Sequence, residues 1–251
     1  MSTSIEILEE AGVRSLHFGS HWIQGAMRIA RPHALELQYT REMMLALLLR
    51  AAPRWPRHVL QIGLGAASLT KFLYRNRPRA ALTVVEIEPA VLAAARQFFK
   101  LPEDPKRLTV AIADGHDYVA ASAREFDLIL VDGFDAKGRA GMLDTLPFYC
   151  NARARLSAQG VFVANLLTST RGVTASLDRI RAAFEGRARA LPPCGGGNAI
   201  VVAATGDPID IPMVELAAAA RALKRDAGLN LLPTIARLAK AHGGDDSLFL
   251  L

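Results

Sequence analysis

Four apolar runs between residues 58 and 135 constrain the fold of this chain more than any other feature. They read HVLQIGLGAAS, LTVVEIE, AIADG and FDLILVDGFD, and each ends in small or acidic residues. Buried parallel strands have this form, because apolar side chains fill both faces of the sheet and polar groups emerge where each strand ends. In open α/β sheets, ligands bind at that carboxyl edge. The runs therefore predict a parallel sheet with a ligand site along one edge.

Expected strands and helices alternate along most of the chain. We expect strands near His58–Ile62, Leu82–Glu86, Leu108–Ile112, Phe126–Val131 and Gly160–Asn165. We expect helices at Ser68–Arg75, Pro89–Phe99, Asp117–Arg124, Leu146–Leu156 and Thr174–Phe184. Arg187–Leu191 and Asn198–Ala203 are expected to close the sheet as an antiparallel pair. The alternation implies an α/β fold with a mostly parallel, seven-stranded sheet and helices on both faces.

The chain divides into two expected parts. Residues 1–55 are expected to form a short N-terminal segment, and residues 56–251 the main domain with its C-terminal helices. Outside the alternating core we expect a hairpin within Leu16–Met27 and helices at Leu35–Leu49, Met213–Asp226 and Leu231–Ala241. The final Leu248–Leu251 is apolar, and we expect it to dock on a neighbour or to fray.

Positive charge is concentrated in one part of the chain. The formal net charge is +6, but Arg14–Arg79 alone holds eleven Lys or Arg residues and two acids. Such a segment can attract nucleic acid or anionic metabolites. A solvated arginine-rich surface is the simpler interpretation, because the segment lacks the interleaved aromatic residues on which bases stack. An enzyme that modifies RNA therefore remains an alternative rather than our main prediction.

Cysteine usage and hydropathy bear on location and metal binding. Cys150 and Cys194 are the only cysteines, and neither belongs to a CxxC or Cys/His pattern, so we expect reduced thiols and no metal site. No apolar run approaches the roughly 20 residues that span a bilayer. The first residues are acidic, unlike a signal peptide. We expect a cytoplasmic protein that does not act on membranes.

The first three runs carry residues suited to an adenosine-containing ligand. Gly63 and Gly65 follow the first strand, where glycine permits a sharp turn beside a ligand. Glu86 ends the second strand and can accept hydrogen bonds from ribose hydroxyls. Asp114 and Gly115 end the third strand, where the acid can accept from an adenine amino group or can simply cap the next helix.

Two features separate this pattern from a dehydrogenase. The dinucleotide fingerprint requires glycine or alanine where this chain has Ser68. No Tyr/Lys or His proton relay of a dehydrogenase can be identified. The order of the runs instead indicates S-adenosylmethionine or a close relative.

Asp132 and Asp135 follow the fourth strand. Two carboxylates at a sheet edge can hold a cationic amine or accept a proton from it. A second interpretation is structural, in which the acids order the next loop by accepting backbone N–H groups. That loop, Ala136–Thr145, contains Gly138 and Gly141 and is a candidate lid.

These motifs together resemble the spermidine synthase family. The resemblance runs from about Arg14 to Ala204 and rests on LELQYTREMM, VLQIGLGAAS, VVEIEP, the DG at Asp114, VDGFDA, LPFY and GNAIVVA. It implies the Rossmann-like fold of class I S-adenosylmethionine-dependent methyltransferases. It also implies a transferase that moves an aminopropyl or methyl group from S-adenosylmethionine or its decarboxylated form to an amine or another small nucleophile, and a homodimer.

The resemblance also implies roles for individual residues. Glu86 would bind the ribose, Asp114 the adenine, and Gly63 and Gly65 would flank the sulfonium. Asp132 would accept a proton from the attacking amine, and Asp135 would help to hold a polyamine. Three N-terminal residues would face the ligands: Gln24 from the hairpin, with Tyr39 and Glu42 from the tyrosine-containing segment.

Two departures from the family pattern leave the reaction open. The family's GGGDGG loop carries an acid that grips the donor amine, and this chain has Ala66 there. The loop after Asp132 reads DGFDAKG rather than DSSDP. Loss of the acid at position 66 removes a repulsion against the carboxylate of intact S-adenosylmethionine. The alternatives are therefore a methyltransferase without a polyamine role and a non-catalytic nucleotide binder.

Overall fold

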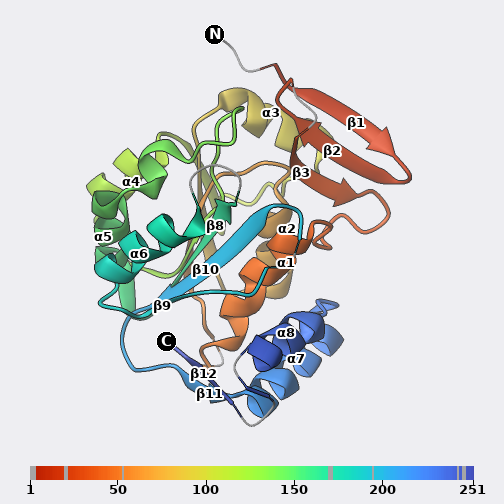
Figure 1. Cartoon of the computed structure of the whole chain (residues 1–251). Coiled ribbons are helices and arrows are strands. Elements are labelled where there is room, and N and C mark those ends of the chain that lie inside the picture. Colours follow the sequence, from red (N-terminus) through yellow and green to blue (C-terminus); the bar gives the residue numbers. More distant parts are fainter. Residues whose placement is uncertain are drawn as a thin grey trace.

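The computed structural model describes residues 4–19, 22–52, 54–168, 172–193, 195–241, 243–244 and 247–251 (Figure 1). Cys194 lies outside these residues. A seven-stranded sheet with the strand order β6-β5-β4-β7-β8-β10-β9 forms the centre. Its strands are β4 (His58–Ile62), β5 (Ala81–Glu86), β6 (Leu108–Ile112), β7 (Phe126–Val131), β8 (Leu156–Leu167), β9 (Ala188–Ala190) and β10 (Asn198–Ala204).

All neighbouring strands of this sheet are parallel, except that β10 runs antiparallel to both β8 and β9. The expected α/β fold, the mostly parallel sheet and the closing antiparallel pair are confirmed.

Helices cover both faces of the sheet, as the sequence predicts (Figure 1). One face carries α4 (Gly115–Ala121), α5 (Leu146–Ala154) and α6 (Val173–Ala183). The other carries α2 (Ser68–Asn76), α3 (Pro89–Phe98), α7 (Met213–Ala227) and α8 (Leu232–Ala241). Two apolar clusters fill the spaces between the layers, one with Phe148 and Phe162 and one with Phe72 and Val84. The apolar strands thus bury both of their faces.

The N-terminal part is larger than the expected hairpin. It is a three-stranded antiparallel sheet of β1 (Glu6–Glu10), β2 (Val13–His17) and β3 (Ile23–Arg28). The expected hairpin is the β2–β3 pair. The sequence did not reveal β1, because this edge strand is mostly exposed and its residues, EILEE, lack an alternating apolar pattern.

The expected helix at Leu35–Leu49 is shorter and changes form. An α-helix, α1, spans Gln38–Met43, and a 3₁₀ turn, η1, continues over Met44–Leu48. The prediction of one regular helix was wrong because the apolar run is buried on every side and carries no helical periodicity. These elements pack against β8, β10 and α7, so the N-terminal part contributes to the main core.

The apolar tail packs on its own chain. Leu248–Leu250 forms β12, which pairs antiparallel with β11 (Asp210–Pro212), and Phe249 is fully buried. The expectation that the tail frays was wrong, because β11 offers a strand edge for it and the Phe249 side chain is buried. Among the residues described, no helix has both the length and the apolar character required to cross a bilayer.

Candidate active site

The candidate site lies where β4 and β7 meet at the carboxyl edge of the sheet. The strand order reverses between these two strands, and ligands bind at such switch points. Gly63, the first residue after β4, has a φ of +88°. A Cβ atom there would lie 2.1 Å from the backbone oxygen of Asp132. Glycine is therefore required for the two strand ends to approach this closely.

The buried amide of Gln61 fixes the turn that follows β4. Its Nε2 donates to the carbonyl of Gly63 at 2.7 Å, and the Thr70 hydroxyl on α2 donates to its Oε1 at 2.8 Å. Both ends of this buried amide therefore have partners, as buried polar groups require. The glycine turn is held between β4 and the first turns of α2.

Glu86 ends β5, and backbone groups orient its carboxylate. Oε2 accepts from the N–H of Leu64 and Oε1 from the N–H of Glu88, each at 2.9 Å. Burial raises the pKa of Glu86, while the hydrogen bonds to the backbone act in the opposite direction. Each oxygen keeps a further lone pair, so the carboxylate can accept from a diol as well.

Asp114 both caps α4 and lines the cavity. Its Oδ1 accepts from the N–H of His116 at 2.8 Å and of Asp117 at 3.4 Å. The capping interpretation is therefore correct as far as Oδ1 is concerned. The other oxygen, Oδ2, has no hydrogen-bond partner among the described residues, so it can accept from a ligand amino group.

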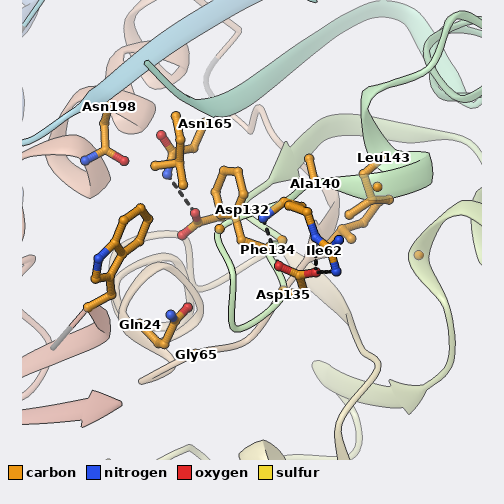
Figure 2. Close-up of a pocket in the computed structure, with 18 of the residues that line it drawn as sticks. Gln24, Ile62, Gly65, Asp132, Phe134, Asp135, Ala140, Leu143, Asn165 and Asn198 are labelled. Atoms are coloured by element: carbon orange, nitrogen blue, oxygen red, sulfur yellow. Dashed lines mark hydrogen bonds and ion pairs between the residues drawn. The ribbon is translucent and has the colours of Figure 1, made fainter. Parts of the chain in front are cut away.

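Asp132 is partly buried and held from two sides. The Tyr39 hydroxyl donates to Oδ2 at 3.0 Å. The Asn165 amide donates to Oδ1 at 2.9 Å (Figure 2). Burial raises the pKa of Asp132, and both hydrogen bonds partly offset that increase. Burial also raises the pKa of Tyr39 well above its ordinary value, so its hydroxyl stays protonated and remains a donor. The result is a fixed carboxylate with raised basicity.

Asp135 is turned toward its own loop. Its Oδ1 accepts from the N–H groups of Lys137 and Arg139, and its Oδ2 accepts from the Arg139 guanidinium at 2.8 Å. Although burial acts in the opposite direction, the Arg139 and Lys137 contacts together lower the pKa of Asp135. This arrangement is the structural alternative considered for the Asp132–Asp135 pair, and it orders the start of the candidate lid.

One cavity of about 850 Å³ brings most of the predicted residues together. Predicted residues that line it are Gln24, Tyr39, Gly63, Gly65, Glu86, Asp114, Gly115, Asp132 and Asp135. Residues of the β2–β3 connection, the loop after β7 and the turn before β10 complete the walls. The described lining contains four carboxylates and one cation, Arg139, which is paired with Asp135. An acidic cavity in a chain of net charge +6 suits a cationic ligand.

Glu42 is the predicted residue that the structure places elsewhere. Its side chain is buried and forms an ion pair with Arg237 of α8, and it accepts from the Thr234 hydroxyl at 3.3 Å. It does not line the cavity. Tyr39 and Glu42 are three residues apart on α1, and the short helix directs Tyr39 to the site and Glu42 to the C-terminal helices.

Ala66, the departure from the family's glycine loop, faces the N-terminal sheet. A Cβ atom on Gly25 of β3 would lie 2.7 Å from the Cβ of Ala66. Ala66 is buried and is not among the residues that line the cavity, whereas its neighbour Gly65 is. The glycine loop therefore contributes backbone, and no carboxylate, to the cavity wall.

Asn165 and Asn198 line the cavity but were not predicted (Figure 2). Asn165 lies in β8 where the apolar run GVFVA ends in a polar residue, the same signal that identified Glu86 and Asp132. Its Oδ1 is buried without a partner among the described residues. A buried acceptor left unpaired beside a carboxylate is a position for a ligand N–H. Asn198 follows a glycine run and gave no comparable signal.

One group of side chains could in principle hold a metal ion. Asp114, His116 and Asp117 each offer a ligand atom, and these atoms lie within 4.8 Å of one another. Asp117 is 81% exposed, and the Asp114 oxygen is engaged in capping α4. Clusters of this kind are common without a metal, and the geometry favours the capping role.

The sequence matches the family model of the spermine/spermidine synthase domain over residues 37–173. A polyamine aminopropyltransferase from Chromobacterium violaceum is 41% identical over 202 residues, which cover 79% of this chain and 75% of the relative. The chain belongs to the spermine/spermidine synthase family. The predicted resemblance and the expectation of a spermidine synthase-like transferase are therefore confirmed at the level of the family.

Further relatives extend the similarity to both ends of the chain and to methyltransferases. A polyamine aminopropyltransferase from Neisseria meningitidis is 34% identical over 247 residues, or 98% of this chain and 93% of the relative. Human methyltransferase-like protein 13 in complex with SAH has a TM-score of 0.67 and 26% identity, and covers 76% of this chain and 93% of that one. The class I methyltransferase fold expected from the sequence is confirmed.

Proposed function

We propose that this protein is an aminopropyltransferase. It takes an aminopropyl group from decarboxylated S-adenosylmethionine and transfers it to a primary amine of a small diamine or polyamine. The observation that carries this proposal is the partly buried Asp132 carboxylate, held by Tyr39 and Asn165 at the switch point of the sheet. The curated relatives with this activity support it.

The donor fits the residues around the glycine turn. The Glu86 carboxylate would accept from the two ribose hydroxyls, and the free Oδ2 of Asp114 would accept from the adenine amino group. The backbone at Gly63 and Gly65 would lie beside the sulfonium. When bound, the donor supplies a carbon activated by the positively charged sulfur.

Asp132 performs the proton chemistry in this proposal. Its carboxylate orients the attacking amine and accepts one proton as the new C–N bond forms. The C–S bond breaks, and its electron pair stays on the sulfur of methylthioadenosine. The unpaired Oδ1 of Asn165 would accept a second N–H of the same amine. Most of the acceleration then comes from positioning the two reactants.

The charges of the cavity favour a decarboxylated donor over S-adenosylmethionine itself. Among the described residues that line the cavity, the one cation is Arg139, and Asp135 already binds it. The carboxylate of intact S-adenosylmethionine would therefore enter an acidic cavity without a free cationic partner. The aminopropyl ammonium of the decarboxylated form carries the favourable charge.

The proposal is tested with the substitution Asp132→Asn, which keeps the shape of the side chain and removes its charge. The full-length protein is supplied with decarboxylated S-adenosylmethionine and 1,4-diaminobutane, and methylthioadenosine release is measured. Loss of general-base function should lower kcat/KM by about 10²- to 10⁴-fold. Methylthioadenosine should still bind. Full activity of the variant would contradict the role of Asp132.

Methyl transfer is a second candidate that two observations favour. Position 66 carries no acid to hold an aminopropyl ammonium, and a methyltransferase with bound SAH shares the fold at 26% identity. In this alternative, S-adenosylmethionine would be consumed and S-adenosylhomocysteine released. The same assay with the intact donor and a panel of amines distinguishes the two reactions by their nucleoside product.

A further inference from the structure

A second cavity, of about 640 Å³, lies outside the candidate active site. Its walls come from residues 30–36, from α1 and α2, and from residues 226–230, which form the end of α7 and the connection to α8. Helix α1 and the residues before it separate the two cavities, since Leu37 and Tyr39 line the first while Glu36 and Arg41 line the second. Neither the proposed donor nor the proposed amine uses this space.

The second cavity carries uncompensated positive charge. Arg31, Arg41 and Arg75 line it, and none forms an ion pair with a described carboxylate. Of the two acids in the lining, Glu36 is bound at both oxygens by Arg28. The other, Asp226, acts electrostatically on Arg77, which lies outside the lining, and raises the pKa of that arginine against the effect of burial. Three guanidinium groups therefore remain for an anion.

Local geometry prepares two of the cavity's side chains for binding. The Arg41 guanidinium is fixed because Nε donates to the Leu35 carbonyl at 2.7 Å and one terminal nitrogen donates to the Glu36 carbonyl at 2.8 Å. The Nδ1 atom of His33 is buried and has no partner among the described residues. Burial, together with the neighbouring positive charges, lowers the pKa of His33. A bound anion would give the protonated His33 ring a hydrogen-bond acceptor, and it would offset the positive charge around that ring.

We propose that this cavity binds a small molecule that carries a phosphate group. Guanidinium groups present paired N–H donors that match the oxygens of a phosphate. The concave shape and the buried floor, formed by Phe72, Leu35 and Leu229, suit a compact ligand rather than an extended polymer. Binding of such a ligand would explain part of the positive charge concentrated in Arg14–Arg79, because this segment supplies all three arginines.

Calorimetric titration of the full-length protein with inorganic pyrophosphate tests the site. The cavity variants are Arg31→Gln and Arg75→Gln, because both side chains are exposed and carry no described interaction that folding requires. The matched control is Arg79→Gln, an exposed arginine of the same segment outside the cavity lining. We expect affinity to fall about tenfold in each cavity variant, as loss of one charged hydrogen-bonding group predicts, and to be unchanged in the control.

Two outcomes would overturn the proposal. Either the wild-type protein does not bind pyrophosphate, or the control variant loses as much affinity as the cavity variants. A single-stranded RNA that binds more tightly than pyrophosphate, and that Arg79→Gln weakens equally, would assign the charge to an extended nucleic-acid surface instead. The titration does not depend on catalysis, so its result is separate from that of the Asp132→Asn assay.

Discussion

The basicity of Asp132 results from opposing effects of its neighbours. Burial raises the pKa of this carboxyl, and the hydrogen bonds from Asn165 and Tyr39 stabilise the ionised form and lower it. A general base is most effective when its pKa approaches the working pH. The two donors therefore favour the ionised form of a carboxyl that burial makes more basic.

The substitution Tyr39→Phe should move the acid limb of the kcat/KM profile to higher pH. The lost hydroxyl no longer stabilises the carboxylate, so the pKa of Asp132 rises further and activity requires a higher pH. The profile of methylthioadenosine release against pH measures this shift. Tyr118→Phe removes the same atom outside the cavity lining and should leave the limb in place. A downward shift in Tyr39→Phe would show that the hydrogen bond does not act on Asp132.

Among individual residues, the sequence correctly placed in the cavity those that follow strands, but it misplaced one residue of helix α1. Glu86, Asp114 and Asp132 follow apolar runs, and parallel strands bring such residues to one edge. Asn165 carried the same signal and could have been found. Glu42 could not be placed, because a difference of three residues on α1 decides between the cavity and the C-terminal helices, and no periodicity in LELQYTREMM fixes that orientation.

Among the elements, α2 carries an unusual buried charge. The Lys71 side chain is fully buried, and its ammonium donates to the Phe99 carbonyl at 2.7 Å, which joins α2 to the end of α3. No described carboxylate forms an ion pair with it. Burial, aided by the nearby Lys100, lowers the pKa of Lys71 to about 7.

This lowered pKa predicts a pH-dependent stability that Lys71→Met should remove. Between the folded-state pKa of about 7 and the ordinary value of 10.5, the unfolded state binds more protons than the folded state. The free energy of unfolding therefore rises with pH in that window, and falls as pH drops toward 7. Urea denaturation of the wild type should show a gain of up to about 2 kcal/mol from pH 7 to pH 9 that Lys71→Met lacks.

The exposed Lys106 offers a matched control for this experiment. Lys106→Met removes the same charge without altering a buried group, so it should retain the pH dependence of the wild type. Equal pH dependence in Lys71→Met and the wild type would show that Lys71 is not responsible.

Elements with strong local signals were predicted to within a few residues, and the others were not. The strands β4, β6 and β7 coincide with the expected ranges because each is an apolar run with polar ends. β1 is an exposed edge strand, η1 is buried all round, and β12 exists through its pairing with β11. These three elements depend on contacts with residues far away in the chain, and the local pattern of a single sequence does not reveal such contacts.

Across the whole molecule, an ion pair with a buried carboxylate joins regions that are distant in sequence. Glu42 of α1 is only 2% exposed and binds Arg237 of α8. Removing one partner of a buried pair leaves an uncompensated charge, which costs about 3–5 kcal/mol. Arg237→Met should therefore lower the free energy of unfolding by about this amount in urea denaturation.

The double variant Glu42→Gln/Arg237→Met separates the pair from general loss of packing. It removes both charges and should recover most of the lost stability. The exposed Arg225 of α7 provides a control, since Arg225→Met should change stability by less than about 0.5 kcal/mol. If the double variant were no more stable than Arg237→Met, the stranded Glu42 charge would not be the cause.

The central claim is that the acidic cavity selects a decarboxylated, cationic donor despite Ala66. Calorimetric titration of the full-length protein with decarboxylated S-adenosylmethionine and with intact S-adenosylmethionine tests it most directly. We predict tighter binding of the decarboxylated form, because the described cavity offers four carboxylates and its single arginine is already paired. Tighter binding of intact S-adenosylmethionine would contradict the claim and favour methyl transfer.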